Sequence, residues 1–136
     1  MVKTVDFPEW YDQVAPNVCD RLGFELVELT AERVVGSFPV AGNTQPIGIL
    51  HGGISALLVE TLGSLGAMAH ALPDRVAVGV DMNVTHLRQT REGRVTGTAT
   101  AVRLGGRTAI YQVDLHNDQG KLVCTGRITC QLIKRH

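Results

Sequence analysis

The chain has 136 residues, a length that favours a single domain, because domains cluster at roughly 100–150 residues. Hydrophobic residues make up 44% of the sequence and charged residues 19%, a composition typical of globular rather than disordered proteins. Thirteen basic and thirteen acidic residues give a formal net charge of zero. A neutral chain lacks the electrostatic attraction on which nucleic-acid-binding and anionic-membrane-binding proteins depend, so neither partner is expected.

Three cysteines, Cys19, Cys124 and Cys130, form no C-x-x-C pair and cannot all be paired within one chain. The first ten residues include three charged ones and do not resemble a signal peptide, so a reducing cytoplasm is the expected compartment. No His or Cys stands at the spacing of zinc ligands. We therefore expect structural thiols, no metal and no other cofactor.

The first third of the chain predicts one helix and two strands. Apolar residues recur every four positions over about residues 8–22, which predicts a short amphipathic helix. Strands are expected over 24–29 and 34–40. A stretch rich in turn-forming residues, 41–50, follows them.

Residues 52–71 form the most apolar segment, with one formal charge, Glu60, and no proline. Twenty apolar residues are enough to span a membrane, but four glycines, a central carboxylate and the lack of a flanking basic cluster argue against that. A helix apolar on nearly all sides is otherwise a buried one. Glu60 shares one strip of this helix with small residues, where a ligand or another backbone can approach: Gly53, Ala56, Gly63, Ser64 and Ala67.

After residue 73 the pattern changes to a period of two. It predicts four strands, over about 76–84, 95–101, 109–115 and 122–132. The breaks between them are plausible hairpin turns, at Glu92-Gly93, Gly105-Gly106 and residues 117–120. Four consecutive hairpin-linked strands predict an antiparallel sheet that wraps the lone apolar helix, which is an α+β fold. No repeat or linker divides residues 1–136, so we expect one domain with its core over about 23–133.

The candidate site lies in residues 43–64. Two glycines, Gly52 and Gly53, open the buried helix, so unpaired N–H groups at its positive end could stabilise an oxyanion; a simple loop-to-helix joint is the alternative. His51 alone is more often a structural histidine. Glu60 is more informative, because burying an unpaired carboxylate costs several kcal/mol. It must be paired, protonated or functional, and the pattern favours function.

Residues 45–64 strongly resemble the hotdog-fold acyl-CoA thioesterases of the PaaI type. The likeness rests on Gln45-Pro46 and on Leu50-His51-Gly52-Gly53, with Glu60 nine residues after the histidine and Ser64 one helical turn further. It covers roughly residues 20–133 and extends to Gly79-Val80-Asp81-Met82-Asn83, His86-Leu87-Arg88, Glu92-Gly93 and Gly106-Arg107-Thr108. The similar branch includes 1,4-dihydroxy-2-naphthoyl-CoA thioesterases and one class of 4-hydroxybenzoyl-CoA thioesterases. The hotdog fold that it implies, a long central helix wrapped by a curled antiparallel sheet, matches the order of elements derived above.

The resemblance implies hydrolysis of an acyl-CoA thioester with an aromatic or broad range of acyl groups. Glu60 would be the nucleophile or the general base, and the N–H of Gly52 would polarise the carbonyl. Gln45 and His51 would orient the thioester or the leaving thiolate, and Ser64 would position the water. The resemblance also implies a homodimer or homotetramer, with the His-Gly-Gly loop and the glutamate of each active site on different subunits.

Further residues are candidates for substrate contacts. Four of them lie on the helix and would line the pocket for the acyl group, which could be a flat aromatic slot or a longer tunnel. They are Gly53 at the start of the helix and Leu57, Thr61 and Met68 further along it. Candidates for the phosphates of coenzyme A are His86, Arg88 and Arg107, which could equally be solvated charges at strand ends.

Two other functions are compatible with parts of this pattern. A hotdog-fold hydratase or dehydratase also pairs a histidine with an acid, but paired glycines before a helical glutamate favour hydrolysis. A non-catalytic acyl-binding protein on the same fold has no need of a buried carboxylate, so Glu60 together with Gln45 and Ser64 argues against it.

Overall fold

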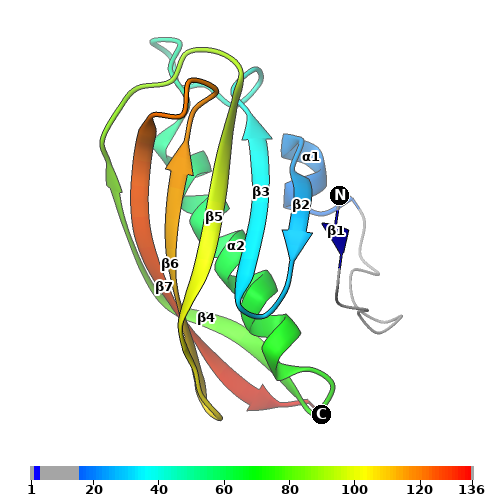
Figure 1. Ribbon diagram of the computed structural model, residues 1–136. Helices are drawn as coiled ribbons and strands as arrows, with labels where there is room; N and C mark the ends of the chain where they lie inside the picture. Colours follow the sequence, from blue (N-terminus) through cyan, green and yellow to red (C-terminus); the bar gives the residue numbers. More distant parts are fainter. Residues whose placement is uncertain (1, 4–15, 136) are drawn as a thin grey trace.

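The computed structural model describes residues 2–3 and 16–135, which form two helices and one sheet. The elements in chain order are β1 Val2–Lys3, α1 Val18–Leu22, β2 Glu25–Leu29, β3 Arg33–Pro39, α2 Gly52–Ala71, β4 Arg75–His86, β5 Arg94–Leu104, β6 Thr108–His116 and β7 Leu122–Lys134. The strand order is β1-β2-β3-β5-β6-β7-β4, and only the β1–β2 pair is parallel. The sheet curls around α2 (Figure 1), which confirms the predicted α+β architecture.

The long helix α2 is the centre of the core. It contacts every strand from β2 to β7, and Leu58, Val59 and Leu62 on it are fully buried or nearly so. A β-carbon added to Gly66 would lie 2.7 Å from the ring of Tyr111, so the helix glycines allow the sheet to approach closely. By length and composition α2 could cross a membrane, but the sheet encloses it as a core helix.

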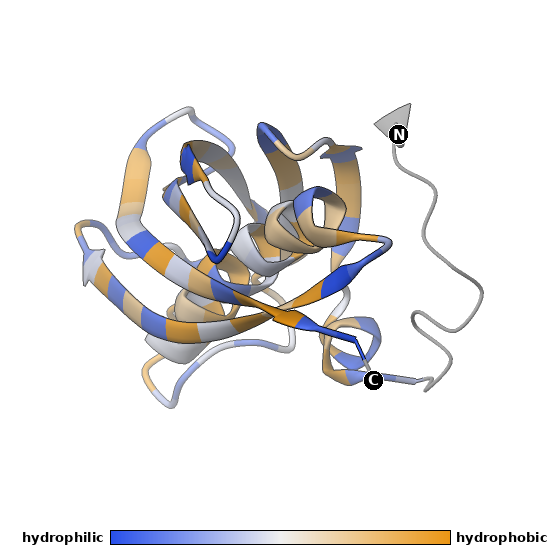
Figure 2. Ribbon diagram, turned by 90° about the horizontal axis from the view of Figure 1, so that it is seen from below, coloured by the Kyte–Doolittle hydropathy of each residue, from blue (hydrophilic) through white to orange (hydrophobic). Residues whose placement is uncertain are grey.

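The predicted alternation of buried and exposed residues is confirmed along most of β5, β6 and β7. It is wrong for β4, which lies at the edge of the sheet and bulges between Gly79 and Asp81, so that Val78 and Val80 are both exposed. In β6 the buried residues are every second one: Ala109, Tyr111, Val113 and Leu115. Apolar and polar residues alternate along the ribbons of the sheet when it is seen from below (Figure 2). The inward residues form one cluster with the buried residues of α2.

The predicted hairpin at Glu92-Gly93 is wrong. β4 pairs along its length with β7, at the edge of the sheet, whereas β5 pairs with β3 and β6. Residues 87–93 therefore carry the chain from the edge strand to the middle of the sheet, past the N-terminal end of α2 (Figure 1). The turns at Gly105-Gly106 and 117–120 do join neighbouring strands, as predicted.

The N-terminal helix is shorter than predicted within the described residues. It begins at Val18, because Asn17 caps it: the Asn17 side chain accepts from the N–H of Asp20 (3.1 Å), and the Asp20 carboxylate accepts from the N–H of Asn17 (3.0 Å). Gly23 ends it with φ of 83°. Residues 8–15, the first part of the predicted helix, lie outside the described residues.

Candidate active site

The loop between β3 and α2 is fixed by a buried asparagine. The side chain of Asn43 donates from Nδ2 to the backbone carbonyls of Leu22 (2.9 Å) and Pro39 (2.8 Å). Its backbone carbonyl accepts from the N–H of His51 (2.9 Å). These bonds join the loop to the end of α1 and the end of β3. They hold Gln45 and His51, which flank the loop tip, in one conformation.

The first residues of α2 present N–H groups at the end of this loop. His51 is the N-cap, and its Nδ1 accepts from the N–H of Gly53 (2.8 Å). The proton of the neutral ring is therefore on Nε2, where it can be donated. Within the described residues, the N–H of Gly52 makes no hydrogen bond. It lies at the positive end of a 20-residue helix, where negative charge is stabilised.

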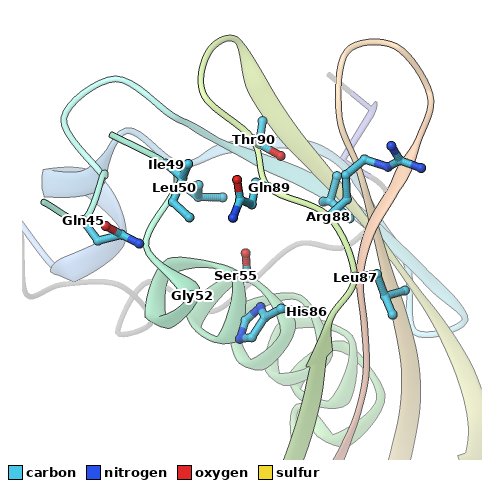
Figure 3. A pocket seen from close by; sticks show the side chains of 11 residues that line it. Gln45, Ile49, Leu50, Gly52, Ser55, His86, Leu87, Arg88, Gln89 and Thr90 are labelled. Atoms are coloured by element: carbon cyan, nitrogen blue, oxygen red, sulfur yellow. The ribbon is translucent and has the colours of Figure 1, made fainter. Parts of the chain in front are cut away.

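A cavity of about 420 Å³ opens beside this helix end, a volume typical of small-molecule sites. Gln45 and Gly52 line it from one side, and His86 and Arg88 line it from the end of β4 (Figure 3). The Oε1 of Gln45 accepts from the N–H of Ile47 (2.7 Å). This bond leaves the amide nitrogen of Gln45, which points towards the start of α2 in Figure 3, to donate elsewhere.

Glu60 lies in a different place. It lines a separate cavity of about 220 Å³ beside the bulge of β4, where a β-carbon added to Gly79 would lie 3.1 Å from its Oε2. The expectation that Glu60 is buried is wrong for the single chain, in which this residue is exposed. The physical reason is that β4 is an edge strand, and no further strand of the described chain covers the helix face beside it.

Ser64 lies half-buried one helical turn beyond Glu60. Burial raises the pKa of the nearby Cys130 thiol on β7. An interaction with Ser64 partly offsets this rise, and the charge of Glu60 adds to it. Cys124 is also buried, and burial raises the pKa of its thiol. Both cysteines lie in the core, as predicted, and neither is paired in a disulfide.

The remaining predicted site residues are not gathered around either cavity. Thr61 faces α1, where its hydroxyl lies 3.5 Å from the sulfur of Cys19, and Leu57 packs on the core. Met68 lies near the far end of α2 and lines neither cavity. Arg107 stands in the β5–β6 turn, which His70 joins to the C-terminal part of α2 through the carbonyl of Gly105 (2.7 Å). One cavity is therefore lined by Gln45, Gly52, His86 and Arg88, whereas Arg107 lies outside it.

Three polar residues of this region were not among those predicted from the sequence. Asn43 holds the loop, and Ser55 and Thr90 line the cavity and are buried. The position of Ser55, three residues after Gly52 on the same helix face, is a signal that would have found it. Thr90 carries no such signal, because the pattern placed it just before a hairpin turn that does not exist.

The two parts of the site are too far apart to act on one atom within a chain. Glu60 is the eighth residue after Gly52 on α2, which places it about 12 Å further along the helix axis. Reacting groups must come within about 3.5 Å. One chain thus supplies a cavity with N–H donors at one end of α2 and a carboxylate near its middle.

A curled antiparallel sheet around one long helix is the hotdog fold. A solved thioesterase from Haemophilus influenzae has the same architecture, with a TM-score of 0.84 and 35% identity over 88% of this chain and 85% of that one. The model of the "Thioesterase superfamily" matches residues 47–124. A protein of Vibrio cholerae is 41% identical over 111 residues, 81% of this chain and 74% of that protein.

The 1,4-dihydroxy-2-naphthoyl-CoA hydrolase of Escherichia coli is 31% identical over 118 residues, 86% of this chain and 87% of that enzyme. The resemblance seen in the sequence is thereby confirmed. The chain belongs to the thioesterase superfamily, and its fold and relatives make it a hydrolase.

Proposed function

We propose that the protein hydrolyses an acyl-CoA thioester, with an aromatic or broad range of acyl groups, to a free acid and coenzyme A. The observation that carries the proposal is the pair of donors beside the 420 Å³ cavity, the N–H of Gly52 and the amide of Gln45. Donors at a helix N-terminus stabilise the oxyanion that forms when a thioester carbonyl is attacked. The residues need no metal or other cofactor for this chemistry.

The carboxylate of Glu60 is the proposed nucleophile or general base. With water as the nucleophile, Glu60 takes a proton while the new C–O bond forms, and the oxyanion rests on Gly52 and Gln45. The C–S bond then breaks and coenzyme A leaves as a thiolate, oriented by Nε2–H of His51. Ser64, one turn from Glu60, positions the water. Direct attack by Glu60 gives the same products through an anhydride that water opens.

A second copy of the chain completes the site in this proposal. β4 is a free edge among the described strands, and Val78 and Val80 on it are 41% and 56% exposed. Exposed edges of this kind pair readily with another strand. A partner docked on this edge would bring its own loop to the Glu60 of this chain, so that the 12 Å separation is bridged between subunits. The dimer can pair further into a tetramer.

The charged part of coenzyme A would lie at the open side of the cavity. Arg88 is exposed there and His86 stands beside it, which supports both as phosphate contacts. Arg107 of the same chain lies too far along the sheet for that role. Three free cysteines agree with a reducing, cytoplasmic location.

A free-thiol assay over aromatic, short, medium and long acyl-CoA substrates tests the proposal, together with Glu60→Gln. We expect that variant to lose roughly a hundredfold or more of turnover, the scale of a lost general base, and still to bind acyl-CoA. Glu32→Gln, an exposed glutamate in the β2–β3 turn, is the matched control and should keep parental turnover. Thiol release no faster than the blank on every substrate would show an acyl-binding protein. A change in enoyl absorbance without thiol release would show a hydratase.

A further inference from the structure

Thr90 carries an unusual hydroxyl group. The residue is 7% exposed, and Oγ1 of Thr90 is the buried side-chain oxygen or nitrogen that lacks a hydrogen-bond partner among the described residues. Buried polar groups in folded proteins are nearly always satisfied, so an orphaned one at a cavity wall indicates a partner that arrives with a ligand.

The backbone of Thr90 is held in place against the loop before α2, and little of the residue reaches solvent. Its carbonyl accepts from the N–H of Leu50 (2.8 Å), and the next residue, Arg91, donates from its guanidinium to the carbonyl of Ile47 (3.3 Å). These bonds join the 87–93 segment to the loop before α2. The junction closes one wall of the 420 Å³ cavity.

Two hydroxyls face each other across this cavity. Figure 3 shows the oxygen of Thr90 pointing in from the 87–93 segment and the oxygen of Ser55 pointing in from α2. Ser55 is also buried, and within the described part of the chain its side chain makes no hydrogen bond. The two sides of the cavity thus present neutral hydroxyls, each of which can donate one hydrogen bond and accept up to two.

Neutral hydroxyls and buried walls do not suit the phosphates of coenzyme A, which need cations and solvent. The one cationic residue lining the cavity, among those described, is Arg88, and it is exposed at the open side. In the proposed pose the thioester is held at Gly52 and the nucleotide lies outside at Arg88, and the acyl group rather than the pantetheine arm reaches Thr90. This step rests on the proposed thioesterase function.

We propose that Thr90 is a specificity-determining residue, whose hydroxyl binds a hydroxyl or carbonyl substituent on the acyl group of the substrate. Ser55 bonds the same substituent or its neighbour from the opposite wall. An acyl group without such a substituent leaves the hydroxyl of Thr90 unpaired in the complex. A site built around a hydrogen bond discriminates strongly against the analogue that lacks the bonding group.

The test compares Thr90→Val, which keeps the branched shape and removes the hydroxyl, with Thr90→Ser, which keeps the hydroxyl. The substrates are benzoyl-CoA with its three hydroxybenzoyl isomers, and butyryl-CoA with 3-hydroxybutyryl-CoA. We expect Thr90→Val to lower kcat/KM by roughly tenfold or more for at least one hydroxylated member and to leave its unsubstituted counterpart within twofold. Thr90→Ser should retain the preference. Thr100→Val, on an exposed residue of β5, is the control and should change neither.

Equal effects of Thr90→Val on both members of every pair, or no effect on any, would overturn the proposal. The proposed function can fail separately, if the parent protein releases no thiol from any substrate. In that case, calorimetric titration with thioether analogues, in which a methylene separates sulfur from carbonyl, tests whether Thr90 binds the substituent without any need for catalysis. Tenfold weaker binding of a hydroxylated analogue to Thr90→Val, with the plain analogue unchanged, supports the role of Thr90, and equal binding rejects it.

Discussion

The imidazole of His86 packs directly over Gly52, so that a β-carbon at Gly52 would lie 3.0 Å from Nε2 of His86. His86 ends the edge strand β4 and Gly52 begins the central helix α2. The contact fixes one side of the cavity at the helix terminus where the oxyanion is proposed to form. It also explains why this position is a glycine, since any side chain would displace the histidine.

Replacing Gly52 with Ala is therefore expected to reduce activity without unfolding the protein. The added carbon pushes His86 aside by a few tenths of an ångström and obstructs the donor N–H. We expect turnover to fall roughly tenfold or more, since small displacements at a reacting centre are costly. The melting temperature should stay near the parental value, because alanine favours a helix over glycine by up to about 1 kcal/mol.

Gly106→Ala is the matched control for this change. Gly106 lies in the β5–β6 turn, and a β-carbon there would meet no atom within 4 Å. It should alter neither thiol release nor the melting temperature. Parental turnover in Gly52→Ala would contradict the role given to this end of α2.

Asn43 offers a second test, because it holds the loop that carries Gln45 and His51. Asn43→Ala removes the donors to Leu22 and Pro39 and leaves two partly buried carbonyls unpaired. We expect a loss of about 1–3 kcal/mol in the free energy of unfolding, measured by urea titration, and a fall in kcat. Asn117→Ala also removes two side-chain hydrogen bonds, which the Asn117 oxygen accepts from backbone N–H groups in the exposed β6–β7 turn, away from the cavity, and it should cost stability while kcat is preserved. Equal kcat in both variants would show that Asn43 is structural only.

Much of the fold could be predicted from the sequence because its signals are local. The apolar run 52–71 coincides with α2, and alternation located β4 to β7 to within a few residues. The pairing of β4 with β7 could not be predicted. A turn signal such as Glu92-Gly93 shows that the chain reverses direction, but not which strand it joins next. That choice depends on how the sheet closes around the helix.

The candidate site was predictable only where a motif marks it. Gln45, His51, Gly52 and Glu60 stand at a recognisable spacing, but their separation into two places follows from the length of α2 and the position of β4. Thr90 enters the cavity because residues 87–93 cross the helix end. No local pattern encodes that crossing, which is why the residue was missed.

The two buried cysteines predict how stability depends on alkaline pH. Burial raises the pKa of the thiols of Cys124 and Cys130, so the folded protein keeps protons that the unfolded chain releases above about pH 8.5. Their contribution is thus complete below that pH and is lost as the pH rises through the folded-state pKa values. Urea unfolding between pH 7 and 10 should show falling stability, by at most about 1.4 kcal/mol per pH unit for each thiol.

The double variant Cys124→Ala/Cys130→Ala separates the thiols from other alkaline effects. It should be less stable at pH 7, because small cavities remain in the core, but its stability should fall less steeply above pH 8.5. An unchanged slope in the double variant would show that other groups govern the alkaline loss. Tyr111, whose pKa burial also raises, is the next candidate at still higher pH.

The last prediction concerns the division of the active site between two subunits. Gln45→Ala should disable the donor side of a site, and Glu60→Gln should disable the carboxylate side, so each variant alone is nearly inactive. If both groups served one site within a chain, mixed assemblies of the two variants would contain no intact site and would be as inactive as either variant alone. If they come from different chains, a mixed dimer holds one intact site and one doubly defective site. Random reassembly of equal amounts, after unfolding and refolding together, then restores about one quarter of the unmutated activity, because half of the dimers are mixed and each mixed dimer has one intact site out of two.

Light scattering on the same samples must show a dimer or tetramer. In the control, each variant is unfolded and refolded separately before the two proteins are mixed. Thiol release that stays at the level of the separate variants after joint refolding would place both groups in one chain, against the 12 Å spacing along α2.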